Sequence, residues 1–177
     1  FNPSQYSELI NQISKTSNSQ IVMFNNRRSS IWNKKSISVL KKSNSKVLST
    51  SHILNKEELY ALSKIRNIKK SIKKIINLNP SINIIVSNAD KKTYGYEEAN
   101  FISCKPPKIK AINENGAGDV MAGTYIYYKS QEHKLNSALS LAVAAGTLYA
   151  KRKNTKININ HTSIKKINNY IICKSEK

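Results

Sequence analysis

Apolar residues alternate along the chain between short runs and longer stretches in which they recur every three to four positions. Short runs bounded by polar residues predict core strands at 20–24, 46–49, 82–86 and 108–112, and alternation at 93–96 and 99–103 predicts a hairpin. The longer stretches predict helices at 4–16, 37–42, 56–65, 68–78, 117–129, 135–150 and 163–172. Strands that alternate with helices predict an α/β fold with a largely parallel sheet.

The length of the chain fits one domain over residues 1–177. No stretch approaches the run of about eighteen apolar residues that a membrane-spanning helix needs. No secretory signal is visible, so we expect a cytoplasmic location and no membrane partner. The first residue is Phe1 rather than Met, so we also expect that the natural N-terminus is missing.

The net charge of +20 suggests a polyanionic partner at first sight. The cations are nearly all lysines spread along the chain, however, and arginine is the residue that favours bidentate recognition of phosphates and guanines. We therefore expect a solvated lysine surface that attracts anionic ligands such as ATP, and not a nucleic-acid partner. A basic nucleic-acid-binding module stays open as an alternative.

The cysteine and histidine positions do not suggest a direct metal site. Cys104 and Cys173 form no CxxC pair, so we expect free thiols in a reducing compartment. His52, His133 and His161 lack the spacing of zinc ligands.

The most informative stretch is the Gly-rich turn at residues 112–123, where an expected strand yields to an expected helix. Unpaired N–H groups at a helix N-terminus, together with the helix dipole, bind anions such as a phosphate. Asp119 would lie in the same first turn, where a carboxylate can accept the proton of an attacking hydroxyl. Ordinary helix capping, with Asn115 as N-cap, explains the same residues equally well.

Gly116-Ala117-Gly118-Asp119 followed by Ala122-Gly123 resembles the second signature of the ribokinase-like (PfkB) carbohydrate kinases. The resemblance implies that the backbone of Gly116, Ala117 and Gly118 forms an anion hole. It also implies that Asp119 is the general base that deprotonates the acceptor hydroxyl.

A second match lies upstream, where Asn55-Lys56-Glu57-Glu58 resembles the Asn-x-x-Glu motif of the same family. The resemblance implies that Asn55 and Glu58 help to hold magnesium and phosphate through water. The alternative is a capping box, in which Asn55 caps a helix and Glu58 returns a hydrogen bond.

The rest of the chain matches the family in order. Ser87 and Ala89 stand where the family has its Thr-x-Gly nucleotide loop, and Asn115 is a further nucleotide-binding candidate. The Ala-rich stretch 135–150 resembles the helix that follows the turn, with Val143 at a frequent asparagine position. An Asn before the turn and Met-Ala-Gly after it most resemble the pseudouridine kinase branch.

The resemblance implies a Rossmann-like ribokinase fold, ATP and Mg²⁺ as cofactors, and phosphoryl transfer to an alcohol group of a sugar or nucleoside. Family members also carry an N-terminal half with a lid and most sugar contacts, and this chain shows no counterpart of it. We therefore expect the C-terminal portion of a kinase domain, as a fragment or a truncated copy. A catalytically inactive relative stays open as an alternative, and so does a homodimer of the full-length protein.

Overall fold

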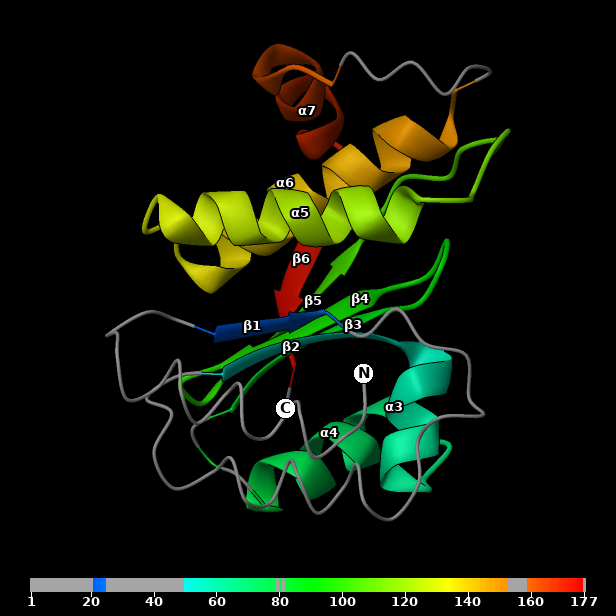
Figure 1. The fold of residues 1–177 in the computed structure, drawn as a ribbon. Helices are drawn as coiled ribbons and strands as arrows, with labels where there is room; N and C mark the ends of the chain where they lie inside the picture. The colour runs from blue at the N-terminus through cyan, green and yellow to red at the C-terminus, as the bar shows by residue number, and fades with distance from the viewer. Residues whose placement is uncertain (1–20, 25–49, 79, 81, 153–158, 177) are drawn as a thin grey trace. The chain divides into compact units, whose positions relative to one another are not determined.

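The structure is a computed structural model that describes residues 21–24, 50–78, 80, 82–152 and 159–176 (Figure 1). The helices expected at 4–16 and 37–42 and the strand expected at 46–49 lie outside the described residues. The chain divides into two compact units between Val86 and Ser87, and each unit is described by itself.

The described residues of the first unit form three strands and two helices. Strand β1 (Ile21–Phe24) pairs in parallel with β2 (Thr50–Asn55), and β3 (Ile82–Ser87) follows β2 in the strand order. The strands expected at 20–24 and 82–86 are confirmed, whereas β2 was not predicted. The first residues of β2 are polar, yet Ser51 and His52 are buried as fully as Ile53 and Leu54. A hydropathy pattern therefore missed a strand that is buried on both faces.

Helices α3 (Lys56–Ser63) and α4 (Ile68–Leu78) confirm two predictions. Helix α3 ends two residues earlier than expected because Lys64 takes a left-handed backbone conformation, with φ of 61°. Two buried serines join the helices, since Ser63 Oγ donates to Ser71 Oγ at 2.9 Å. Lys74 Nζ also donates to the carbonyl oxygen of Ser63 at 2.8 Å and so caps the end of α3.

The second unit begins with the predicted hairpin of β4 (Thr93–Glu97) and β5 (Asn100–Lys105), which is antiparallel. Its two-residue turn has φ values of 47° at Glu98 and 63° at Ala99, as the tightest hairpins require. A third strand, β6 (Ile172–Ser175), pairs with β5 in the antiparallel direction.

Two secondary-structure predictions for this unit were wrong. Residues 108–112 form no strand; this segment is a coil in which the amides of Ile112 and Asn113 both donate to the carbonyl oxygen of Ala150. The expected helix at 163–172 is instead α7 (His161–Asn168), and the chain then turns into β6. The α/β fold class is confirmed, but the sheet is mixed, because only the described pairing in the first unit is parallel and those in the second are antiparallel.

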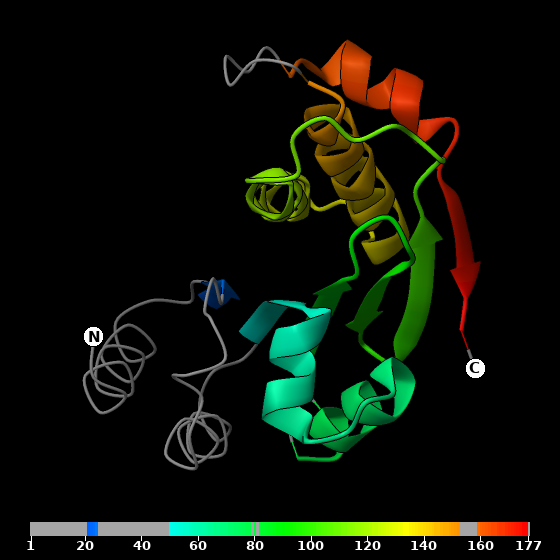
Figure 2. The ribbon, with the colours of Figure 1, turned by 90° about the vertical axis from the view of Figure 1, so that its right-hand side faces the viewer.

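Helices α5 (Ala117–Ser130) and α6 (Leu135–Ala150) confirm the predictions at 117–129 and 135–150. Helix α6 is the centre of the second unit, because it contacts α5, α7 and all three strands there (Figure 2). Small side chains on α6 allow this close packing: a Cβ atom added to Gly146 would lie 3.0 Å from the carbonyl oxygen of Ala117. The first turn of α5 therefore rests directly on α6.

The expectation of free thiols was wrong in the structure, where Cys104 and Cys173 form a disulfide. The two residues are direct partners in the antiparallel pair of β5 and β6, and this register brings their Cα atoms to 4.0 Å. They lie 69 residues apart, so no local spacing could have suggested the pairing. Within the described ranges, no helix is long and apolar enough to cross a membrane.

Candidate functional site

Helix α5 begins without a side-chain cap. Its N-cap residue is Gly116, with φ of 84° and no side-chain hydrogen bond, so the interpretation of Asn115 as N-cap was wrong. The turn is held by its backbone, since Ala117 N donates to Glu114 O at 3.1 Å and Val120 N to Gly116 O at 3.0 Å. The amide of Gly118 precedes the first helical hydrogen bond and so has no acceptor within the helix.

The first turn of α5 is open to solvent. Gly118 and Asp119 are both exposed, and a Cβ atom added to Gly118 would meet no atom within 4 Å. Asp119 places a carboxylate in the first helical turn, beside backbone amides that carry the positive end of the helix dipole. This arrangement leaves room for an anion near the Gly118 amide, with a carboxylate in the same turn.

Helix α6 supports the turn through direct contacts. The backbone of Gly116 lies in the left-handed region, and a Cβ atom added there would lie 3.0 Å from Tyr149 Oη. The guanidinium of Arg152 lies over the Tyr149 ring, at 6.0 Å from its centroid. Glycine is therefore needed at position 116 for two reasons, its backbone conformation and the contact with Tyr149.

The segment after β3 forms a second turn. Lys91 N donates to Asn88 O at 2.9 Å, and Ala89 has φ of 47°. This conformation favours glycine, so an alanine in it carries a backbone cost of roughly 1–2 kcal/mol. Ser87 is half-buried and Ala89 is exposed, which leaves the tip of this turn accessible.

At the start of α3, the capping-box interpretation of Asn55 and Glu58 is confirmed. Asn55 Oδ1 accepts from Glu58 N, and Glu58 Oε2 accepts from Asn55 N, both at 2.8 Å. Glu58 is only 5% exposed. A role in holding magnesium stays a prediction, and so does the expected convergence with Asp119, because the two motifs belong to different units.

The described residues contain no group of three His, Cys, Asp or Glu side chains that could hold a metal ion. Mg²⁺ keeps several waters and is usually held by one or two carboxylates together with substrate phosphates. The fit of Glu58 to this role is therefore restricted to an outer, water-mediated contact, because one of its carboxylate oxygens already accepts from Asn55 N.

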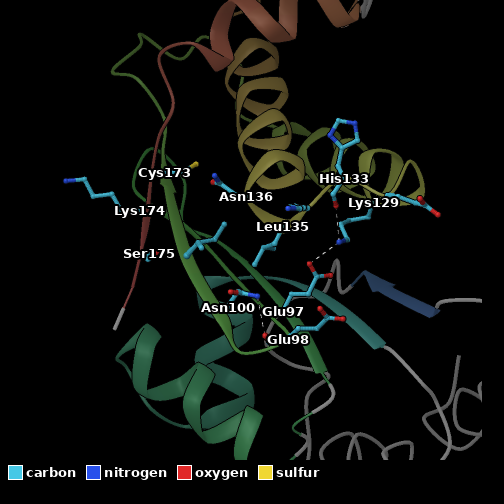
Figure 3. A pocket seen from close by; sticks show the side chains of 13 residues that line it. Glu97, Glu98, Asn100, Lys129, His133, Leu135, Asn136, Cys173, Lys174 and Ser175 are labelled. Atoms are coloured by element: carbon cyan, nitrogen blue, oxygen red, sulfur yellow. Dashed lines mark hydrogen bonds and ion pairs between the residues drawn. The ribbon is translucent and has the colours of Figure 1, made fainter.

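The second unit also has a cavity of about 720 Å³ that the sequence did not suggest (Figure 3). Lys129 reaches across it, and its Nζ lies 2.9 Å from Glu97 Oε2 and 3.1 Å from the carbonyl oxygen of His133. Burial raises the pKa of the neighbouring Tyr125, and the negative charge of Glu97 adds to that shift. None of the predicted site residues lines this cavity, so it stands apart from the Gly-rich turn.

Comparison with known proteins gives a family match. Residues 8–162 match the family described as "pfkB family carbohydrate kinase". A similar curated protein is ATP-dependent 6-phosphofructokinase isozyme 2 of Escherichia coli (strain K12). It is 27% identical over 132 residues, which cover 75% of this chain and 40% of that protein.

Solved structures share the fold. Phosphofructokinase-2 from Escherichia coli, in its tetrameric inhibited form, aligns with a TM-score of 0.74 at 20% identity, over 96% of this chain and 52% of that chain. The 2-dehydro-3-deoxygluconokinase of Thermotoga maritima aligns with a TM-score of 0.74 at 15% identity, over 94% of this chain and 55% of that one. The chain thus spans about half the length of these structures and less than half of the curated relative.

Proposed function

Because this chain belongs to the pfkB family of carbohydrate kinases, we propose that it carries the phosphate-binding turn and general base of an ATP-dependent phosphotransferase. The acceptor is an alcohol group of a sugar or a nucleoside. The start of α5 carries the proposal, since its uncapped, solvent-open first turn holds Gly118 and the exposed carboxylate of Asp119.

Each residue of the turn has a role in this proposal. The turn of Gly116, Ala117 and Gly118 forms the anion hole: the Ala117 amide holds the turn by donating to Glu114 O, and the amides of Gly116 and Gly118 donate toward the oxygens of the transferred phosphoryl group, whose charge spreads over those oxygens during transfer. The carboxylate of Asp119 accepts the proton of the attacking hydroxyl. Because α6 supports the turn through Gly146 and Tyr149, these groups need little reorganisation during the reaction.

The nucleotide would lie along the turns that follow β3 and precede α5. Ser87, Ala89 and Asn115 are the proposed contacts, and the left-handed conformation of Ala89 supports a tight loop of the kind that binds nucleotide. Asn55 and Glu58 would hold Mg²⁺ through water. The bound ion would neutralise phosphate charge, as in other phosphoryl-transfer enzymes.

Pseudouridine is the acceptor that we propose to test first. Asn113 before the turn and Met121-Ala122-Gly123 after it support that branch. In the structure Asn113 has a local role, because its Oδ1 accepts from Asn115 N at 3.1 Å and so shapes the entry to the turn.

The test is the substitution Asp119→Asn in the intact natural protein. Asparagine keeps the shape of the side chain but cannot take the proton, so Mg²⁺-dependent ATP turnover should fall by roughly 10²- to 10⁴-fold. The measurement is turnover against a panel of sugars and nucleosides that includes pseudouridine. Binding of MgATP and the melting temperature should stay close to those of the wild type.

Glu114→Gln is the matched control, because Glu114 is an exposed carboxylate five residues before Asp119 and the change is chemically the same. It should leave turnover unchanged. Turnover of the Asp119→Asn variant at the wild-type level would remove Asp119 as the base. A wild-type protein that binds MgATP but phosphorylates no acceptor in the panel would instead favour an inactive relative.

A further inference from the structure

The disulfide between β5 and β6 lies on the face of these strands that lines the cavity of Figure 3. Side chains of a strand point alternately to its two faces, so residues two positions apart share a face. Cys104 therefore shares a face with Ile102, and its strand partner Cys173 shares that face with Ser175. Ile102, Cys173 and Ser175 all line the cavity. The disulfide and the cavity are thus on the same side of these two strands.

The two cysteines differ in their access to this cavity. Cys104 is fully buried and is not among the residues that line the cavity. Cys173 is half-buried on β6, the last strand of the sheet, and is one of the lining residues. A molecule inside the cavity therefore meets Cys173 and not Cys104.

The cavity suits a small polar molecule. Its volume of about 720 Å³ lies within the range of roughly 300–1,000 Å³ that is typical of ligand pockets. Glu98, Glu132 and Asn136 are exposed residues in its wall, and Lys129 and Glu97 form their ion pair there. A wall of this kind stays hydrated and carries both signs of charge, so a hydrophilic molecule can enter it.

The fold keeps β6 in place by contacts other than the disulfide. Next to β6, the amide of Glu176 donates to Phe101 O at 2.7 Å. Its carboxylate oxygen Oε1 accepts from Ser103 Oγ at 2.6 Å and from Lys92 Nζ at 2.9 Å. The strand is also paired with β5 along its length. Opening of the disulfide should therefore leave β6 paired with β5.

We propose that Cys173 is a site of reversible modification by a small hydrophilic thiol, which reaches it through the cavity and opens the disulfide. The thiolate of the small molecule attacks Sγ of Cys173 and forms a new S–S bond with it. The bond between Cys173 and Cys104 breaks, and its electron pair leaves with the sulfur of Cys104, which takes a proton from water. A second small thiol then attacks the adduct, so that both cysteines end as thiols and the two small molecules leave as their own disulfide.

The position of Cys173 favours a small thiol over a redox protein as the partner. Thiol–disulfide exchange requires that the attacking sulfur reach its target directly. Here the target is half-buried in the wall of a cavity, and its disulfide partner Cys104 is fully buried. A free small thiol can enter such a space, whereas the reactive cysteine of a protein is carried on a much larger surface.

The test follows the reaction of the oxidised protein with reduced glutathione, without denaturant. Samples are quenched with acid, and peptide mass mapping locates the adduct. The mixed disulfide should form on Cys173, with Cys104 as the free thiol, and the rate should rise in proportion to the glutathione concentration. Far-UV circular dichroism should not change during the reaction, since β6 stays paired.

Asn136→Trp tests the route, because it places a large side chain in the wall of the cavity. Thr162→Trp is the matched control: both positions are exposed and each is the second residue of its helix, but Thr162 is not in the cavity wall. Asn136→Trp should slow the reaction by roughly tenfold or more, because exchange depends on access. Thr162→Trp and Asn136→Ala should react like the wild type.

An adduct on Cys104 would overturn the proposal, and so would an unchanged rate in Asn136→Trp. A rate that does not depend on the glutathione concentration would also overturn it, because the disulfide would then open only when the protein unfolds. Reduction by thioredoxin without any reaction with glutathione would assign the disulfide to a redox protein instead. If Asn136→Trp does not fold, the position of the adduct in the wild type still decides. None of these measurements uses phosphoryl transfer, so the outcome is independent of the kinase assignment.

Discussion

The sequence suggested two helix N-termini as phosphate sites, those of α3 and α5. In the structure the first has side-chain caps on its backbone amides and the second has none. Helix α3 begins at a capping box in which Asn55 and Glu58 satisfy each other's backbone amides. Helix α5 begins at Gly116 with no side-chain cap, and the space around Gly118 is open. One helix end uses its own side chains as hydrogen-bond partners, whereas the other has no side-chain cap.

The difference separates a helix end that is capped by side chains from one that is not. Every helix has early amides without acceptors in the helix, so a glycine or a capping residue in the sequence does not decide the question alone. What decides it is whether a neighbouring side chain supplies the acceptor. Residues that can cap are present at both ends, but only Asn55 does so, because Asn113 accepts from Asn115 N outside the helix.

The segments that lead into the two helices also differ. Strand β2 reaches α3 through the buried residues Ser51 to Leu54, whereas a coil leads to α5 through the exposed residues Lys110 to Ile112. The first helix end is therefore fixed by a buried strand. The second is fixed by the contacts of Gly116 and Ala117 with α6.

Acid should destabilise the fold through His52, which lies in the strand that leads into α3, and this is the largest effect that we predict for stability. Burial lowers the pKa of His52 in β2 to about 4, against 6.5 for an ordinary histidine. The unfolded chain then binds more protons than the folded one between these values. The contribution of neutral His52 to the free energy of unfolding is fully present above pH 6.5. It falls by about 3 kcal/mol as the pH is lowered to 4.

The measurement is urea unfolding at pH 7, 5 and 4 for the wild type and for His52→Leu. Among the described residues His52 Nδ1 has no hydrogen-bond partner, so leucine breaks no observed bond. The variant should lose about 3 kcal/mol less than the wild type between pH 7 and 4. Parallel pH curves would show that His52 is not buried in a neutral form.

Gly116→Ala should be the next largest effect, because it forces a side chain into the left-handed region. The backbone cost is roughly 1–2 kcal/mol, and the new Cβ would also press on Tyr149 Oη. Gly118→Ala should cost nothing in stability, because its Cβ would meet open space and alanine favours the helix. Chemical denaturation of both variants measures the difference.

Gly118→Ala nevertheless has a functional consequence if the open space is the anion site. Its methyl group should weaken MgATP binding while leaving the free energy of unfolding unchanged or higher. Destabilisation by Gly118→Ala equal to that by Gly116→Ala would contradict the geometry of the turn.

The sequence predicted the α/β class and the helices at 56–65, 68–78, 117–129 and 135–150 because their apolar stripes are regular. It missed β2 because Ser51 and His52 are polar residues, which do not give the apolar pattern of a buried strand although both are buried. It missed β6 because the partner that makes Ile172–Ser175 a strand is β5, far away in the chain. The same distance hid the disulfide between Cys104 and Cys173.

The candidate site was only partly predictable for a similar reason. Gly116 to Asp119 could be located from the local pattern, because a Gly-rich turn before a helix is a local feature. The support from Tyr149 and Gly146 could not be predicted, since it depends on how α6 packs against α5. The sequence allowed two roles for Asn55, helix capping and ligand binding. The hydrogen bond from Glu58 N to Asn55 Oδ1 in the structure shows that it caps α3.

Asn55→Ala compares the two helix ends directly. It should lower the free energy of unfolding by about 1 kcal/mol, because the amide of Glu58 loses its acceptor. Asn115→Ala is the matched control at the other end, and it should change stability by less than about 0.5 kcal/mol since Gly116 is the N-cap there. Thermal unfolding of both variants gives the answer. Equal losses would mean that Asn115 also caps its helix.

Ala89→Gly should have the smallest effect and the opposite sign. Ala89 has φ of 47°, so glycine removes a backbone cost of roughly 1–2 kcal/mol. Glycine also adds freedom to the unfolded chain, which takes back about 0.4–1 kcal/mol. The net result should be a gain in stability of roughly 0 to 1.6 kcal/mol. Ala99→Gly is the control, because Ala99 has φ of 63° in the β4–β5 hairpin, and it should gain a similar amount.

If the turn after β3 contacts the nucleotide as proposed, only Ala89→Gly should also change the affinity for MgATP, measured by calorimetry. A loss of stability in Ala89→Gly alone would show that the backbone at position 89 is not left-handed in solution.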